Sequence, residues 1–511
     1  MIAIIADIHL SDTPGASQWA CLDWALNVLK KKRPSAIVVI GDITSCGQSN
    51  AAQNFRRRLD ETKIPFLITA GNAELRDKTS AARLCKILKT GNRLETRNAT
   101  ILAVDSASAT VADADIAECE RELAAANGKP VVVVTHVPPK FLPARVRKWF
   151  EKKLAGGNIS LLVAGHNHRD IVVNYARGAL MVVRGLDPDK AIGGPPALAF
   201  MELSGGKWKR ADEVFAEGSP AGLTDHARRE FADLLGICCL DEPMATLDFA
   251  AENLIRCVEL RAKNLHAPAK TLARKIARWR NRGGKNLFLH MPNLQFNPGS
   301  GQASEPAEWL ACLRQCVVLG VNRLTIHVPA SVPVNRMAAD SPIRAAVFRF
   351  LVRHLLPLTK NNIKIAVENL HMPQGRPADG SCGFGYLPDE CHDWIKQLRG
   401  ELGADKVGFL LDVGHARNNE PFSKTIGLSD WYARLGRETL AYHVHQVNVI
   451  HEITMKNHQG IKCLYGPIIS FSGFLWAWRK RQLNHAPILV EVSNFVSRRK
   501  TVKYLQKMLG A

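Results

Sequence analysis

Side chains that can bind metal ions recur directly after apolar runs in the first half of the sequence. Five such places occur in this order: Asp7-Ile8-His9, Gly41-Asp42, Gly71-Asn72, Thr135-His136 and Gly165-His166-Asn167-His168. Carboxylates, imidazoles and an amide oxygen from several strand ends are suitable ligands for two divalent ions. Two ions ~3.5–4 Å apart can hold a hydroxide and neutralise a phosphoryl group during in-line attack. A carboxylate such as that of Asp42 can bridge them.

The apolar runs that precede these residues are of strand length and alternate with helical stretches. They occupy 2–8, 35–43, 66–72, 100–106, 131–137, 160–166, 179–185 and 197–203. Buried strands separated by helices predict an α/β layered domain over residues 1–215. A segment rich in Gly, Pro and charge follows, and we interpret residues 216–230 as a linker.

The five motifs resemble those of the calcineurin-like metallophosphoesterase family, which run D-x-H, G-D, G-N-H-D/E, H and G-H-x-H. The resemblance implies a β-sandwich flanked by helices and two divalent ions, Mn²⁺ first, with Fe or Zn as alternatives. It implies that Asp7, His9, Asp42 and His168 hold one ion, and that Asp42, Asn72, His136 and His166 hold the other. Asp42, Asn72 and His136 would be catalytic.

One position departs from the family pattern. The residue after the motif's Asn is usually a His that contacts the phosphate and assists the leaving group, and here it is Ala73. Loss of a general acid typically costs ~10²–10⁴-fold in rate unless another donor replaces it. Because every ligand position is filled, we expect a working variant, with a metal-bound but catalytically weak domain as the alternative.

The second half of the sequence contains eight further strand-sized runs. They lie at 235–242, 255–262, 286–292, 323–331, 363–370, 407–415, 440–448 and 487–494. Helical patterns such as 306–320 and 342–358 separate most of them. Eight β/α units over residues 231–511 predict a (β/α)8 TIM barrel.

Imidazoles and carboxylates follow these runs, at the strand ends where TIM-barrel active sites lie. They are His290, His327, Glu368, Asp412, His415, His445, His458 and Glu491. A single buried His or Glu is often satisfied by a neighbouring group. Eight such residues at corresponding positions favour a metal site instead.

This pattern resembles the xylose-isomerase-like barrels, which include sugar isomerases and nucleases of the endonuclease IV type. Both branches keep a Glu–Asp–His–Glu set, here Glu368, Asp412, His445 and Glu491. The nuclease branch adds two early histidines, matched by His290 and His327, and a third zinc site, of which His415 and His458 match two ligands. The resemblance implies two to three Zn²⁺ (or Mn²⁺), with Glu368 and Glu491 catalytic.

Two departures concern this second set. The family's last zinc site pairs its His with an Asp two residues earlier, whereas this chain has Lys456, so the third ion could be weak, differently bound or missing. The family's strand-seven motif usually reads H-x-N-D, whereas this chain has His445-Gln446-Val447-Asn448. His443 lies on the same face of its strand as His445, because strand side chains alternate. We prefer His445 as the ligand, with His443 as the alternative.

The charge of the chain indicates its partner. There are 68 Lys and Arg against 47 Asp and Glu, a formal net charge of +21. Such an excess favours a polyanion, and we expect nucleic acid, DNA more than RNA. The basic segment 270–285 is interpreted as an outer barrel helix rather than a binding element. Scattered cysteines, with no apolar stretch of ~20 residues and no leader-like start, favour a cytoplasmic protein without a membrane partner.

These observations predict a metal-dependent phosphodiesterase or nuclease in DNA repair, processing or defence. Two alternatives remain. One is a nucleotide or small-molecule phosphodiesterase fused to a sugar isomerase or epimerase, which would not require His290 and His327 as ligands. The other is a non-catalytic binding module, in which Ala73 and Lys456 are signs of lost function.

Overall fold

The computed structural model describes residues 1–509 except 78, 127, 298–299, 330–331, 334–341, 373–380, 383 and 451–453. The chain forms two compact units. The first comprises residues 1–221, 424–429 and 463–476. The second comprises residues 222–423, 430–462 and 477–511. Two short segments from the second half of the sequence therefore belong to the first unit.

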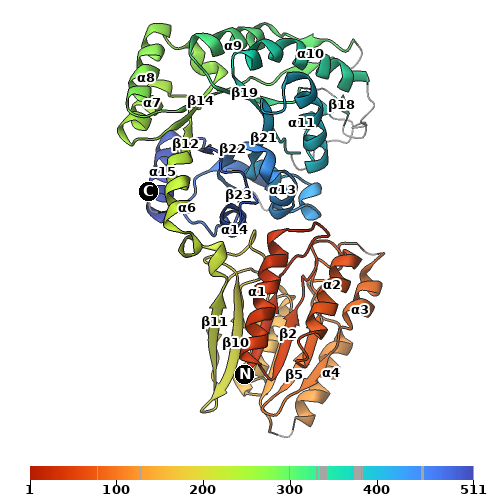
Figure 1. Cartoon of the computed structure of the whole chain (residues 1–511). Helices are drawn as coiled ribbons and strands as arrows, with labels where there is room; N and C mark the ends of the chain where they lie inside the picture. The colour runs from red at the N-terminus through yellow and green to blue at the C-terminus, as the bar shows by residue number, and fades with distance from the viewer. Residues whose placement is uncertain are drawn as a thin grey trace. The chain divides into compact units, whose positions relative to one another are not determined.

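The first unit is built on two β-sheets (Figure 1). Its strands are β1 (Ile2–Ala6), β2 (Ala36–Ile40), β3 (Phe66–Thr69), β4 (Arg93–Glu95), β5 (Thr100–Ala103), β6 (Val131–Thr135), β7 (Leu161–Ala164), β8 (Ile171–Asn174), β9 (Ala179–Val182), β10 (Ala197–Ser204) and β11 (Lys207–Val214). One sheet has the order β11-β10-β1-β2-β3, and the other has the order β4-β5-β6-β7-β9-β8. Strands β1 to β3 pair in parallel, as do β5, β6, β7 and β9, so their carboxyl ends lie at one edge of each sheet.

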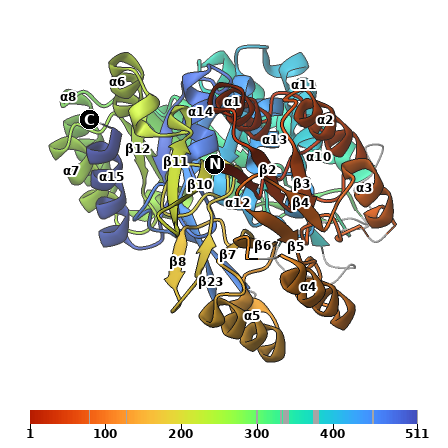
Figure 2. The ribbon, with the colours of Figure 1, turned by 90° about the horizontal axis from the view of Figure 1, so that it is seen from below.

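Alternation of side chains along the strands divides the core of this unit. Val132 and Val134 pack into a cluster shared by both sheets, whereas Val131 and Val133 face the opposite side. The helices are α1 (Ser17–Lys32), α2 (Ser49–Asp60), α3 (Ala81–Leu88), α4 (Asp113–Ala125) and α5 (Ala144–Gly156). Phe150 of α5 packs with Val131 and Val133, and Figure 2 shows α4 and α5 outside the sheet that contains β5, β6 and β7. This is the expected sandwich with flanking helices.

The second unit contains a closed barrel of eight parallel strands. In order around the barrel these are β12 (Leu235–Cys238), β13 (Cys257–Arg261), β14 (Asn286–His290), β17 (Arg323–His327), β19 (Lys364–Glu368), β21 (Val407–Asp412), β22 (Thr439–Val444) and β25 (Ile488–Val490). Side chains such as Phe288, Leu410 and Leu489 fill its interior. The predicted TIM barrel is confirmed, and each of its eight strands overlaps a predicted run.

Helices and short hairpins connect the barrel strands. The helices of this half of the chain are α6 (Asp225–Leu234), α7 (Pro243–Glu252), α8 (Ala269–Asn281), α9 (Ala307–Val318), α10 (Pro342–Lys360), α11 (Pro388–Leu402), α12 (Val413–Arg417), α13 (Leu428–Leu435), α14 (Ser472–Arg479) and α15 (Phe495–Leu509). Two hairpins are β15 (Gln295–Phe296) with β16 (Ala303–Ser304) and β23 (Gln446–Ile450) with β24 (Thr454–Gln459). A further antiparallel pair, β18 (Val332–Pro333) with β20 (Ser381–Cys382), joins strands that flank α10 and β19 in the sequence. Leu272, Ile276 and Trp279 form the buried face of α8, as expected of an outer barrel helix.

Two further observations concern the whole chain. Residues 216–222, in the predicted linker, form two short 3₁₀ turns before α6 begins at Asp225. Within the described ranges, no helix has both the length and the apolar character needed to cross a bilayer.

Candidate metal centres

In the first unit, the loops after β1 and β2 lie side by side. The backbone N–H groups of Ile8 and His9 both donate to the carbonyl oxygen of Asp42, at 2.9 Å. The loop after β3 also lies against the loop after β2, and two glycines allow their close approach. A Cβ on Gly41 would lie 2.5 Å from the backbone nitrogen of Gly71, and a Cβ on Gly71 would lie 2.2 Å from that of Asp42. The G-D and G-N motifs therefore need glycine for packing, in addition to any role of the polar residue that follows.

The backbone at the candidate ligands is strained. Asp7, His9, Asp42, His166 and His168 all have φ between 48° and 66°, in the left-handed region. Residues with a Cβ adopt this region at a cost of roughly 1–2 kcal/mol each. Such strain concentrates where a particular side-chain direction is required for function. These five positions direct their side chains toward one edge of the sheets at the expense of local stability.

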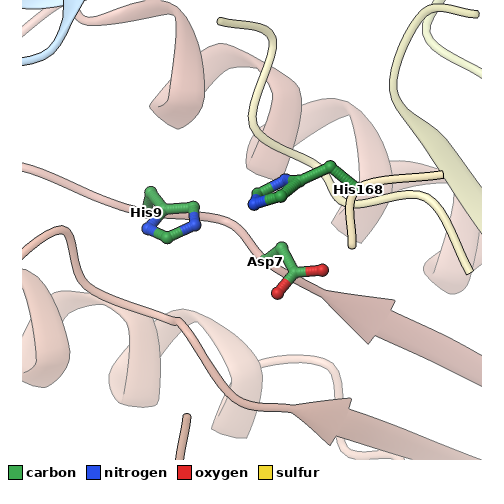
Figure 3. A group of neighbouring side chains, drawn as sticks. All are labelled: Asp7, His9 and His168. Carbon is green, nitrogen blue, oxygen red and sulfur yellow. The ribbon is translucent and has the colours of Figure 1, made fainter. Parts of the chain in front are cut away.

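The side chains of Asp7, His9 and His168 converge (Figure 3). One potential ligand atom from each lies within 4.8 Å of the others, and the two imidazole rings stack with centroids 5.2 Å apart. Among the described residues, Oδ2 of Asp7 and both ring nitrogens of His9 are buried without a hydrogen-bond partner. Buried polar atoms are normally satisfied. A cation among these three residues would satisfy them, so they fit a metal ion.

A second cluster contains Asp42, His136 and His166, whose potential ligand atoms also lie within 4.8 Å of one another. Oδ1 of Asn72 lies 3.0 Å from Nε2 of His136 and 2.8 Å from Nδ1 of His166. Asp42 connects the two clusters, because its Oδ2 is 3.5 Å from Nε2 of His9 and its Oδ1 is 3.4 Å from Nε2 of His136. The structure therefore brings together all seven residues proposed for the first metal centre.

The electrostatics of this region favour cations. Burial, and then the negative charge of Asp42, raise the pKa of Asp7 well above its usual value. Burial, and then the charge of Lys190, lower the pKa of His9 well below its usual value. A bound cation would favour ionised Asp7, and a neutral His9 can donate a lone pair to it.

The two residues after Asn72 do not act as ligands in this arrangement. Ala73 is fully buried, and its backbone N–H donates to Oδ1 of Asp42 at 2.7 Å. Glu74 is also buried and accepts hydrogen bonds from the backbone of Thr44 and Gly71, each at 2.9 Å. Burial and the charge of Asp42 raise the pKa of Glu74 to about 7. Glu74 thus joins the loop after β2 to the loop after β3.

In the second unit, Glu368 lies at the centre of a buried cluster. Its Oε2 atom is 2.9 Å from Nε2 of His290 and 3.2 Å from Nε2 of His327, and its Oε1 atom is 3.1 Å from Nδ1 of His443. The same Nδ1 atom lies 3.0 Å from Oε2 of Glu491 and 3.9 Å from Oδ2 of Asp412. His443, the predicted alternative to His445, therefore lies among the carboxylates of Glu368, Asp412 and Glu491.

His445 belongs to a neighbouring group. Its Nε2 atom is 3.0 Å from Oδ1 of Asp412, and one ligand atom from each of Asp412, His445 and His458 lies within 4.8 Å of the others. Nδ1 of His415 lies 3.6 Å from Oδ2 of Asp412. Lys456 pairs with Asn448 across the β23–β24 hairpin. His445 therefore lies beside His458. Position 456, where the resemblance to endonuclease IV would place an Asp, is occupied by Lys456.

This second region also fits metal ions. Oε2 of Glu491, Nε2 of His327 and Nε2 of His458 are buried and form no well-oriented hydrogen bond among the described residues. Oε2 of Glu491 and Nε2 of His327 nevertheless lie 3.0 and 3.2 Å from Nδ1 of His443 and Oε2 of Glu368. Burial lowers the pKa of His458 to about 4, which leaves its imidazole neutral near pH 7. A cavity of about 400 Å³ opens beside these residues and is lined by Arg261, His290, His327, His458 and Glu491, among others. A substrate could reach ions held there.

Several residues that contact the candidate ligands of this region were not predicted from the sequence. Glu259 of β13 hydrogen-bonds to His443, Arg261 pairs with Glu491, and His371 stacks on His415 with ring centroids 4.6 Å apart. Glu259 and Arg261 lie in one predicted strand, where two charged residues in a buried apolar run are the signal that could have revealed them.

Comparison with known proteins agrees with the geometry of the first unit. Residues 1–170 match the family model of the calcineurin-like phosphoesterases. The first unit carries a calcineurin-like phosphoesterase domain. The family supports a metal-dependent phosphoester hydrolase, and the predicted resemblance of this half is confirmed. No curated protein matches the chain.

Solved structures resemble each unit separately. A dimetal phosphatase from Danio rerio is 12% identical, with 42% of this chain and 98% of that chain covered and a TM-score of 0.33. A D-tagatose 3-epimerase-like protein is 16% identical, with 54% and 97% covered and a TM-score of 0.39. A xylose isomerase domain protein from Alicyclobacillus acidocaldarius is 20% identical, with 54% and 98% covered and a TM-score of 0.36. The chain thus combines a phosphoesterase domain with a closed eight-strand barrel, whose architecture follows from its own strand pairing.

Proposed function

We propose that this protein is a metal-dependent nuclease, with one phosphodiester-cleaving centre in the phosphoesterase domain and a second in the barrel. The single observation that carries the proposal is that each unit gathers its candidate ligands around a shared carboxylate. Asp42 reaches two clusters in the first unit, and Glu368 lies among three histidines in the second. Carboxylates shared in this way suit sites that place more than one ion near a phosphate.

In the phosphoesterase domain, the two clusters suggest which residues would bind each ion. Asp7, His9 and His168 would hold one ion, Asn72, His136 and His166 would hold the other, and Asp42 would contact both. Divalent ions, when bound, lower the pKa of a coordinated water and neutralise the charge of a phosphoryl group. The residues of this chain would supply the remaining requirement, which is a set of ligand atoms held in fixed positions.

Positive side chains lie near both centres and suit an anionic substrate. Burial lowers the pKa of His9 and of His166 most; the charges of Lys190 and Arg76 lower that of His9 further, and the charge of Arg76 lowers that of His166 further. In the barrel, burial and then the charge of Arg261 lower the pKa of His290. Together with the net charge of +21, these cations favour a polyanionic substrate.

The contacts of Glu368 favour hydrolysis over sugar isomerisation in the barrel. A Glu–Asp–His–Glu set alone would serve an isomerase, and Glu368, Asp412, His443 and Glu491 supply it. However, His290 and His327 both approach the same oxygen of Glu368, at 2.9 and 3.2 Å. This additional pair would provide ligands for a further ion, as the resemblance to nucleases of the endonuclease IV type implies.

The proposal is tested with a panel of substrates incubated with the purified protein and added Mn²⁺ or Zn²⁺. The panel contains single-stranded DNA, duplex DNA with and without an abasic site, RNA, cyclic nucleotides and keto-sugars. We expect cleavage of at least one nucleic acid, with DNA preferred over RNA. Turnover of only the cyclic nucleotides or sugars would replace the nuclease with the small-molecule alternative. Metal binding with no turnover at all would favour the non-catalytic one.

A further inference from the structure

Glu259 lies inside the barrel, directly behind the candidate metal ligand His443. It belongs to β13 and is fully buried, as are its three hydrogen-bond partners. Its Oε2 atom accepts from Nε2 of His443 at 2.8 Å and from the thiol of Cys238 at 3.2 Å. Its Oε1 atom accepts from the hydroxyl of Thr325 at 2.7 Å. Both carboxylate oxygens are therefore occupied by donors.

These contacts decide which nitrogen of His443 can bind a metal. A carboxylate only accepts, and carboxylates face both ring nitrogens of His443. With a cation bound at Nδ1, the proton of a neutral His443 lies on Nε2 and is donated to Glu259. The lone pair then lies on Nδ1, which faces Oε1 of Glu368 at 3.1 Å and Oε2 of Glu491 at 3.0 Å. A lone pair directed at two carboxylates is unfavourable unless a cation lies between them.

We propose that Glu259 is a positioning residue of the barrel centre, which fixes the ring and the tautomer of His443 so that Nδ1 binds a metal ion. The inference rests on the metal-binding part of the proposed function and adds a residue to it. A carboxylate behind a ligating imidazole orients the ring and increases its basicity. Glu259 performs this role from a strand whose carboxyl end contributes no residue to the predicted ligand set.

An alternative is that Glu259 is itself a ligand, because Cys238, Glu259 and His443 could hold an ion of their own. Their hydrogen bonds argue against it. The oxygens of Glu259 are already satisfied by three donors, so an ion would have to displace them. Cys238 is fully buried, and its thiol donates to Oε2 of Glu259 at 3.2 Å. The group is better described as support for His443.

The test measures metal affinity of the full-length protein, by competition between the protein and a chromogenic chelator for Zn²⁺. Glu259→Gln keeps the shape of the side chain but lets its amide donate, which favours the wrong tautomer of His443. We expect its barrel site to bind Zn²⁺ about 10–100-fold more weakly than the parent's. Thr325→Val is the matched control, because it removes another donor to Glu259 and leaves the His443 hydrogen bond in place. It should retain affinity within about threefold.

A double-mutant cycle separates positioning from general destabilisation. If Glu259 acts through His443, then Glu259→Gln should cause no further loss of affinity in a His443→Ala background. Equal losses in both backgrounds would overturn the proposal, as would unchanged affinity in Glu259→Gln alone. Since no substrate is involved, a parent that binds Zn²⁺ but cleaves nothing contradicts the nuclease proposal only. A parent that binds no Zn²⁺ in the barrel contradicts both.

Discussion

Oδ2 of Asp42 lies 3.5 Å from Nε2 of His9, while Oδ1 of the same carboxylate lies 3.4 Å from Nε2 of His136. One side chain therefore reaches both clusters of the phosphoesterase domain. Its position depends on the close approach of Gly41 and Gly71, which brings the second and third motifs together. Replacing Asp42 should affect both ions, whereas replacing any other ligand should affect chiefly one.

The first prediction follows from that difference. Asp42→Ala should lower kcat/KM for bis(p-nitrophenyl) phosphate by at least ~100-fold, because two coordinated ions contribute several kcal/mol to the transition state. It should also lose both ions of the domain, as measured by mass spectrometry under native conditions. Asp60→Ala, at an exposed carboxylate of α2, is the control and should behave like the parent. Loss of activity with both ions retained would show that Asp42 is not a shared ligand.

The second prediction concerns Ala73, which fills the position of the family's His and is fully buried. Without an imidazole there to protonate the leaving group, the rate should depend steeply on leaving-group pKa. A general acid is worth ~10²–10⁴-fold, so diesters of phenol should react at least ~100-fold more slowly than those of p-nitrophenol. Single-turnover rates measure the chemical step directly. Similar rates across the series would mean that another group donates the proton.

The sequence predicted the buried strands well because their apolar runs are nearly uninterrupted. The strands that it missed lie at exposed positions and have mixed composition. In β8, three of the four residues are exposed, and in β11 polar and charged residues predominate. Such strands are held by pairing to a neighbour, here β9 and β10, rather than by their own burial. No apolar run marks them.

The candidate ligands could be predicted for a similar reason, since parallel strands gather their carboxyl ends. The choice between His443 and His445 could not be predicted, because both side chains lie on one face of the strand. It depends on where β22 ends, and β22 ends at Val444, between them. Glu259 was missed because its partner His443 lies 184 residues away in the sequence.

The third prediction separates the two centres. Glu368→Ala should reduce the metal bound to the barrel, because three histidines lose the carboxylate that they share. It should leave turnover of bis(p-nitrophenyl) phosphate by the phosphoesterase domain within about twofold of the parent. Glu401→Ala, at an exposed carboxylate of α11, is the matched control. A parallel loss of phosphodiesterase activity in Glu368→Ala alone would contradict independent centres.

The fourth prediction concerns acid stability of the metal-free protein. Burial lowers the pKa of His458 from 6.5 to about 4 in the folded protein. The unfolded chain therefore takes up this proton at a higher pH than the folded protein does. The contribution of neutral His458 to the free energy of unfolding is fully present above pH 6.5 and is lost as pH falls from 6.5 to about 4. In urea unfolding of chelator-treated protein, His458→Gln should lose less stability over this range than the parent.

His226→Gln, at an exposed imidazole, is the control for that comparison and should follow the parent at every pH. Using the difference between variant and parent removes the contributions of other histidines. These include His443, whose pKa its carboxylate neighbours raise despite burial and which acts in the opposite direction. An unchanged pH dependence in His458→Gln would show that His458 is accessible to protons in the folded state.

The most direct test of two separate nucleic-acid-cleaving centres is a gel assay with end-labelled DNA, both single-stranded and as a duplex with one abasic site. The proteins compared are the parent, Asp42→Ala, Glu368→Ala and the double variant, each with Mn²⁺ and Zn²⁺. We expect the parent to cleave, each single variant to lose a different part of that cleavage, and the double variant to lose all of it. Full cleavage by the double variant, or none by the metal-loaded parent, would contradict the account.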